Sequence, residues 1–162
     1  MSNASHYDGS TAAAEAVILA YGHYRNKIKK ILVSRAVNPQ YRQVIRTYMQ
    51  ADTSLQIVGD DPETGIAPDM QKFIAQIDHD TALVIVQYPD FFGRIIDYTQ
   101  LIETAHQFGA LVAVAINPTA LGLLTSPGEI GADIAFGEGQ PLGIPLSYGG
   151  PYLGFFAVKD AL

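Results

Sequence analysis

Runs of apolar residues recur along the chain and mark the strands of a buried sheet. ALVIVQYP (residues 82–89) and ALVAVAINP (residues 110–118) are almost entirely apolar up to the proline near the end of each run. Continuous runs of this kind are typical of parallel strands that are covered on both faces. The same pattern predicts strands over residues 30–36, 55–59, 82–89, 110–118, 132–137 and 152–158.

Helical segments fill the intervals between most of these strands. The Ala-rich stretch TAAAEAVILAYGHY has high helix propensity, which predicts a helix from residue 11 to a point between Gly22 and Asn26. FGRIIDYTQLIETAHQFG carries apolar residues at helical spacing and predicts a helix over residues 92–109, which Gly109 ends. The pattern also predicts helices over residues 39–51 and 69–77 and a turn-rich loop over residues 60–68.

The order of these elements predicts an α/β fold. Strands that are separated by helices need crossover connections, so the first five strands should run parallel to one another. Residues 136–151, FGEGQPLGIPLSYGGP, are rich in glycine and proline and have no helical pattern; we call them the glycine loop. The strand over residues 152–158 follows this loop directly, and we expect it to run antiparallel. Residues 1–162 should form a single domain.

Composition narrows the class of protein and of partner. The net charge is −6, which argues against nucleic acid as a partner because phosphates require clustered lysine and arginine. There is no cysteine, and therefore no disulfide or thiol nucleophile. No apolar run is long enough to span a membrane, so we expect a cytoplasmic protein without membrane contact. Only 16% of the residues are charged, which indicates that part of the surface is covered by more chain or by a partner.

Candidate chemistry lies beyond the carboxyl ends of the parallel strands, where open sheets of this kind bind ligands. Ser10 and Thr11 begin a helix that should point to the same edge. They form either an anion site or an ordinary N-cap. The acidic residues of the loop over 60–68 should be solvated. The histidines lack metal-ligand spacing, so no metal site is expected, and no residue has the context of a nucleophile or a tuned base.

Three long motifs resemble one family. They are SNASHYDGSTAAAEA near the start, NPTALGLLTSPGEIGADIAFGEGQ in the middle, and GEGQPLGIPLSYGGPYLGFFA near the end. Together they resemble the alpha-type (first) subunits of glycine dehydrogenase (decarboxylating), the P-protein of the glycine cleavage system. The resemblance implies the three-layer α/β/α architecture of aspartate aminotransferase, the type I fold of pyridoxal-phosphate enzymes. It also implies that the chain is a central fragment of a longer subunit and an incomplete large domain.

The resemblance also assigns positions for a cofactor site. Ser10 and Thr11 would lie at the phosphate cradle. Asn117 would lie where a catalytic member places an aspartate against the pyridine nitrogen. The position of the Schiff-base lysine would lie around Glu138 to Gln140. Pyridoxal chemistry needs an amine and an acid at these places. Here Gln140 offers no amine and Asn117 offers no charge, so the resemblance implies a vestigial site with no catalytic residue.

The resemblance therefore implies a non-catalytic subunit that carries no cofactor of its own. Pyridoxal phosphate would belong to a second P-protein subunit, and the glycine loop would approach that neighbour. The family reaction decarboxylates glycine and transfers the aminomethyl group to the lipoyl arm of the H-protein. The alternative is an independent small enzyme of the same fold that binds pyridoxal phosphate or a phosphate ester. A nucleotide-binding domain is less favoured because the GxGxxG fingerprint is missing.

The resemblance has a consequence for the last strand. In the type I fold, the strand that leads into the first helix pairs with the antiparallel strand. No strand is predicted before residue 10, so residues 152–158 should present an unpaired apolar edge. Such an edge invites pairing with another chain. We therefore expect the isolated chain to self-associate.

Overall fold

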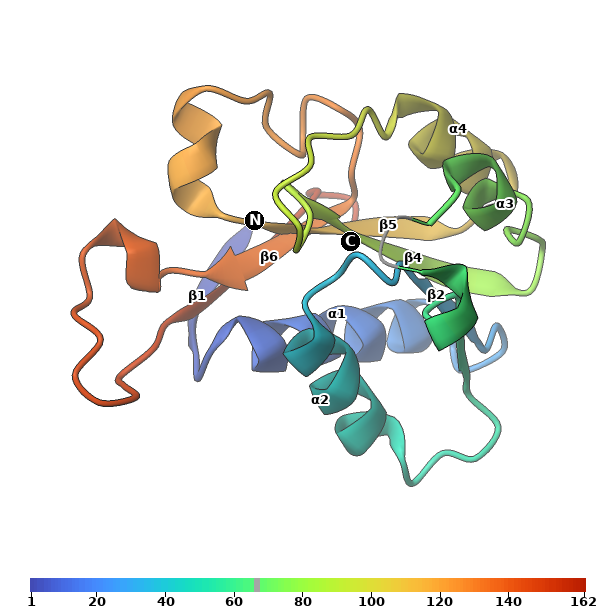
Figure 1. The fold of residues 1–162 in the computed structure, drawn as a ribbon. Helices are drawn as coiled ribbons and strands as arrows, with labels where there is room; N and C mark the ends of the chain where they lie inside the picture. The colour runs from blue at the N-terminus through green and yellow to red at the C-terminus, as the bar shows by residue number, and fades with distance from the viewer. Residues whose placement is uncertain (66–67) are drawn as a thin grey trace.

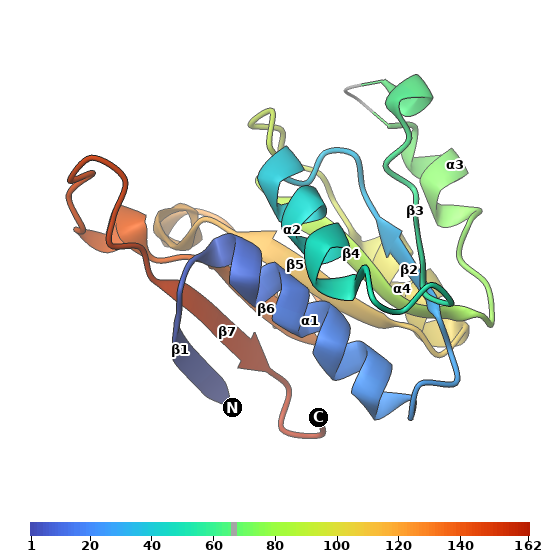
Figure 2. The same ribbon diagram turned by 90° about the horizontal axis from the view of Figure 1, so that it is seen from below.

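The computed structural model describes residues 1–65 and 68–162 and contains a seven-stranded sheet in the order β1-β7-β6-β5-β4-β2-β3 (Figures 1 and 2). The strands are β1 (Ser2–His6), β2 (Lys30–Val33), β3 (Gln56–Val58), β4 (Thr81–Tyr88), β5 (Leu111–Ile116), β6 (Ile134–Glu138) and β7 (Gly154–Val158). The helices are α1 (Gly9–His23), α2 (Pro39–Met49), α3 (Met70–Ile74) and α4 (Thr99–Gln107), with single 3-10 turns η1 (Pro62–Thr64), η2 (Pro118–Gly122) and η3 (Gln140–Leu142).

The strand directions confirm the predicted topology. Strands β2 to β6 pair in parallel, and β7 runs antiparallel to β6 with Ile134 opposite Val158. The glycine loop contains only the short turn η3 and no crossover helix. The loop predicted over residues 60–68 includes residues 66–67, which lie outside the described residues, and the part before them forms η1. The α/β fold class is therefore confirmed.

Helices cover both faces of the sheet and produce three layers (Figure 1). On one face, the alanines of α1 pack on the sheet together with Ile45 of α2. Phe73 of α3 and Leu101 of α4 pack on the other face. The central strands β4 and β5 contribute to both clusters through alternate side chains, as strand geometry requires. Among the described residues, no helix is long and apolar enough to cross a lipid bilayer.

The prediction that residues 152–158 have an unpaired edge is wrong. Strand β1 pairs antiparallel with β7, with Ser2 opposite Ala157 and His6 opposite Gly154 (Figure 2). This strand has few apolar residues, and its conformation depends on a partner about 150 residues later in the chain. The outer edge of the sheet is therefore formed by polar residues, and β7 has a neighbour on each side.

The predicted helix over residues 92–109 is only half present, because α4 begins at Thr99. Asp90 organises the chain before it into a turn: its carboxylate accepts hydrogen bonds from the backbone amides of Phe92 and Arg94, each at 2.9 Å. The Arg94 side chain also donates to this carboxylate, at 2.7 Å. These contacts of the buried Asp90, together with a hydrogen bond from its amide to the Arg94 carbonyl, stabilise a turn that the helical spacing of the apolar residues does not reveal.

Candidate functional site

Two adjoining cavities lie beyond the carboxyl ends of the central strands. The larger has a volume of about 320 Å³ and lies at the start of α1; the smaller has a volume of about 150 Å³ and lies at the end of β5. Tyr41 and Glu138 line both of them. The larger is also lined by Asp8, Gly9, Ser10, Asn38, Gln40 and Tyr152, and the smaller by Gln87, Ala115, Ile116, Asn117 and Pro141.

The start of α1 is closed by its own residues. Asp8 is the N-cap, so the prediction of Ser10 or Thr11 as the N-cap is wrong. The Asp8 carboxylate accepts hydrogen bonds from the Thr11 amide and the Ser10 hydroxyl, both at 2.7 Å. The Thr11 hydroxyl in turn accepts a hydrogen bond from the Asp8 amide. This reciprocal arrangement is a capping box, and it uses both hydroxyls that were candidates for an anion site.

The Asp8 carboxylate gives the start of α1 a negative charge. Burial alone would raise the pKa of Asp8, but hydrogen bonds from Thr11 and Ser10 outweigh it and lower the pKa below the usual 3.8. A carboxylate at a helix N-terminus is also favoured by the macrodipole. Asp8 is therefore ionised at neutral pH, at the helix start where the resemblance implies a phosphate cradle.

Glu138 supplies a second carboxylate at the same place. One oxygen, Oε2, accepts a hydrogen bond from the Gly9 amide at 3.0 Å. The other, Oε1, accepts from the amides of Gln140 and Leu153, each at 2.9 Å. The carboxylate therefore connects the start of α1 with Gln140 in the glycine loop and with Leu153 just after the loop.

Two glycines allow these segments to approach so closely. A Cβ atom on Gly9 would lie 2.1 Å from the Tyr41 hydroxyl oxygen and 3.1 Å from the Glu138 amide nitrogen. A Cβ atom on Gly154 would lie 2.2 Å from the Asp8 carbonyl oxygen. Real Cβ atoms do not approach other atoms this closely, so a larger residue would push the segments apart. The glycine-rich sequence around β7 thus serves contact with the β1–α1 junction of the same chain.

Tyr41 lies between the two cavities and close to both carboxylates. Burial raises the pKa of Tyr41 to about 12, and the negative charges of Glu138 and Asp8 act in the same direction. The phenol therefore stays protonated at neutral pH and can donate a hydrogen bond. It is not available as a general base under these conditions.

Asn117 and Gln140 make only local contacts. Asn117 is exposed, and its side-chain oxygen accepts hydrogen bonds from the Thr119 amide at 3.1 Å and the Thr119 hydroxyl at 2.8 Å, which caps η2. The Gln140 side chain donates to the Ile144 carbonyl at 2.6 Å, inside the glycine loop. Of the four predicted residues, Ser10 lines the larger cavity and Asn117 the smaller one, whereas Thr11 and Gln140 line neither.

The residues at this edge do not fit pyridoxal phosphate. The phosphate would meet two carboxylates and a set of amides that already have acceptors. No lysine among the described residues lines either cavity. Lys159 follows β7 at the opposite end of the strands and binds Asp133 at 2.8 Å. Among the residues that the structure describes, no group of histidine, aspartate and glutamate side chains could hold a metal ion.

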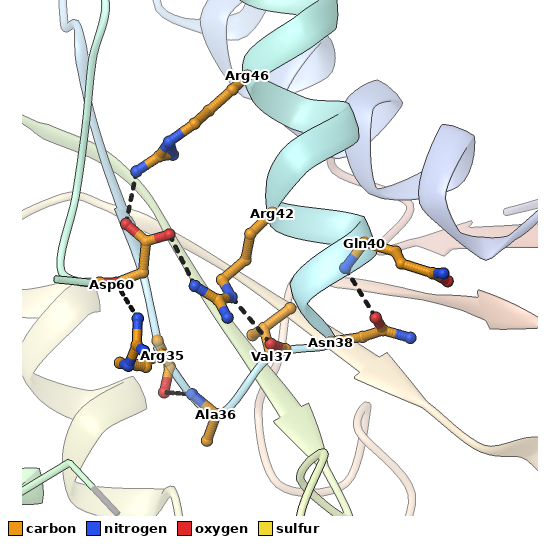
Figure 3. Close-up of polar contacts among 9 residues, drawn as sticks. Arg35, Ala36, Val37, Asn38, Gln40, Arg42, Arg46 and Asp60 are labelled. Carbon is orange, nitrogen blue, oxygen red and sulfur yellow. Dashed lines mark hydrogen bonds and ion pairs between the residues drawn. The ribbon is translucent and has the colours of Figure 1, made fainter. Parts of the chain in front are cut away.

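The prediction that the acidic residues of the loop over 60–68 are solvated is wrong for Asp60. Its carboxylate is buried and binds Arg42 at 3.0 Å and Arg46 at 2.5 Å, while Arg35 donates to its carbonyl oxygen (Figure 3). These contacts tie α2 to the end of β3. An arginine and an aspartate 14 or 18 residues apart carry no pairing signal in a single sequence, so this cluster was not predictable.

Comparison with known proteins gives consistent results over the whole chain. Residues 1–162 match the family model described as glycine cleavage system P-protein. A curated relative from Geobacillus thermodenitrificans (strain NG80-2), "Probable glycine dehydrogenase (decarboxylating) subunit 1", is 47% identical over 162 residues. The match covers all of this chain and 35% of the relative, so the chain spans about a third of the length of such relatives.

Solved structures support the fold. A glycine decarboxylase (P-protein) of the glycine cleavage system, in inhibitor-bound form, aligns with a TM-score of 0.84 and 40% identity, over 96% of this chain and 34% of that one. A cystathionine gamma-lyase from Lactobacillus plantarum aligns with a TM-score of 0.70 at 17% identity, over 99% of this chain and 38% of the other. The second likeness concerns the fold alone, and it confirms the predicted architecture of pyridoxal-phosphate enzymes.

Proposed function

The chain belongs to the glycine cleavage system P-protein family, and from this premise we propose that it serves as a non-catalytic portion of the first subunit. The enzyme, as proposed, decarboxylates glycine and transfers the aminomethyl group to the lipoylated H-protein. Pyridoxal phosphate is held by a second subunit, and this chain supplies one incomplete large domain of the aspartate aminotransferase type. We also propose a cytoplasmic location, since a chain without cysteine needs no oxidising compartment.

One observation carries the proposal of a non-catalytic role. The edge of the sheet where a type I enzyme works holds the carboxylates of Asp8 and Glu138 and has no lysine. Formation of an imine requires an amine, and binding of the phosphate requires free donors. In this proposal Ser10, Thr11, Asn117 and Gln140 occupy the corresponding positions of a site that has lost its chemistry.

The second subunit is proposed to bind at the glycine loop. The relatives are named subunit 1, which implies a partner subunit. The loop projects from the body of the fold beyond β6, shown in orange-red in Figures 1 and 2. Its side chains Leu142, Leu146 and Tyr148 are exposed. Large apolar side chains gathered on one projecting loop are typical of a surface that a partner covers.

Addition of pyridoxal phosphate to the purified chain tests the proposed absence of a cofactor. We expect no saturable imine absorption band, and no single lysine labelled after reduction with borohydride. The reason is that every lysine lies outside the two cavities. A saturable band that maps to one lysine would overturn the proposal and favour the independent enzyme.

Binding of the second subunit tests the proposed partner. We expect Leu146→Asp to weaken capture of the tagged second subunit by the chain at least tenfold, because it places a charge in a covered apolar contact. The matched control is Ile95→Asp, which changes an exposed apolar residue outside the glycine loop. Equal binding by the two variants would contradict a contact through the glycine loop.

A further inference from the structure

We propose that the Glu138 carboxylate is a built-in anion that takes the place of a bound phosphate at the start of α1. The inference rests on the proposed function, since it names the residue that keeps a phosphate group out of this chain. Helix N-termini attract anions through free amides and the macrodipole. Here the anion is a side chain that follows α1 by more than a hundred residues in the sequence.

The first support is the number and position of the groups that Glu138 holds. Its two oxygens accept hydrogen bonds from the amides of Gly9, Gln140 and Leu153, at 2.9 to 3.0 Å. These amides belong to the first turn of α1 and to the two sides of the glycine loop. A bound phosphate commonly collects amides from a helix start and a neighbouring loop in this way. The carboxylate makes the same set of contacts without a ligand.

The second support is that two further amides of the helix start, those of Thr11 and Ala12, already have acceptors. The Thr11 amide donates to the Asp8 carboxylate at 2.7 Å, and the Ala12 amide donates to the Asp8 carbonyl at 3.1 Å. A phosphate would have to displace one carboxylate while lying beside the other.

The third support is the close packing around Glu138. Gly9 leaves no space for a Cβ atom between α1, the Tyr41 hydroxyl and the Glu138 amide. Because the helix start lies directly against the end of β6, the carboxylate reaches the Gly9 amide without an intervening water. Removal of this carboxylate should therefore free the Gly9 amide and open the adjoining cavity toward it.

The test compares the chain with Glu138→Ala and Glu138→Gln, using inorganic phosphate at constant ionic strength as the probe. The measurements are the thermal midpoint of unfolding and the NMR shift of the Gly9 amide. The control is Glu103→Gln, which removes one exposed negative charge from α4. Glu138→Gln keeps one acceptor oxygen and provides the result if Glu138→Ala does not fold.

We expect phosphate to raise the midpoint of the Glu138 variants and to shift their Gly9 amide saturably. The rise should be about 4 °C when phosphate is about tenfold above its dissociation constant. The unchanged chain and Glu103→Gln should show neither effect. Saturable binding of phosphate at Gly9 in the unchanged chain overturns the proposal, and so does the absence of a phosphate response in the Glu138 variants.

The outcome is separable from that of the proposed function. A saturable imine with pyridoxal phosphate elsewhere on the chain would remove the proposed non-catalytic role and would leave the Gly9 result unchanged. Conversely, a Glu138 variant that does not respond to phosphate would overturn the proposal of a built-in anion. It would leave the proposed non-catalytic role in place, because that role rests on the lack of a lysine at the two cavities.

Discussion

At the scale of single residues, the distances around Gly9 and Glu138 determine what this edge of the sheet can do. Polar groups that would face a ligand in an open site are paired with one another here. The sequence motif Asp8-Gly9-Ser10-Thr11 contains a local signal for this, because an aspartate three residues before a threonine can form a capping box. The contact with Glu138 has no such signal, since it joins residues 129 positions apart.

Substitution of Gly9 tests the importance of this close packing. We expect Gly9→Ala to lower the free energy of unfolding by about 2 kcal/mol, because its Cβ atom overlaps the Tyr41 hydroxyl and presses on the end of β6. The matched control is Gly22→Ala in the same helix, where a Cβ atom meets nothing within 4 Å. It should be neutral or stabilising by up to about 1 kcal/mol. Urea unfolding of both variants measures the difference, and equal stabilities would show that α1 shifts at no cost.

At the scale of elements, the local sequence pattern predicted the strands and helices that carry a clear signal in their own residues. The central strands β4 and β5 were predicted from their apolar runs alone, and α1 from its alanines. Strand β1 and the turn before α4 were not, because each depends on a contact outside its own pattern. For β1 that contact is pairing with β7, and for the turn it is the buried carboxylate of Asp90.

Removal of β1 tests its role at the edge of the sheet. We expect deletion of residues 1–6 to expose the apolar strand β7 and to convert the chain into a dimer or larger species at micromolar concentration. Light scattering over a dilution series compares the truncated chain with the chain of residues 1–162. If both have the molar mass of a monomer at every concentration, β1 does not protect the sheet from association.

At the scale of the whole molecule, alternation of elements predicted the topology and the edge at which a site would lie. It did not predict that this end of the sheet would be closed by carboxylates, because the carboxylates and the amides that they bind come from three separate segments of the chain. Another charged cluster lies at the opposite end of the strands, where β6 begins and β7 ends. The buried Asp133 accepts hydrogen bonds from Lys159, His106 and the Val112 amide, and it connects β6 with α4, β5 and the end of β7.

This second cluster predicts how stability depends on pH. Burial opposes the charge of Asp133, but hydrogen bonds from Lys159, His106 and Val112 outweigh it and lower its pKa below 3.8. A carboxyl group with a lower pKa in the folded state stabilises the fold above its unfolded pKa and loses this contribution as the pH falls. Urea midpoints from pH 5.5 to 2.5 should therefore fall less steeply for Asp133→Asn than for the unchanged chain. Asp80→Asn, at an exposed carboxylate, should keep the original slope.

The pairing of β1 with β7 also sets the order of events during synthesis. A ribosome delivers β1 about 150 residues before β7, so β1 has no partner within this sheet until β7 has emerged. Helix α1 follows β1 directly, and the amide of Gly9 likewise waits for Glu138. The parallel strands β2 to β5 can assemble earlier with α2, α3 and α4. The sheet is therefore completed from the middle outward, and β1 is among the last of its strands to pair although it precedes all the others in the sequence.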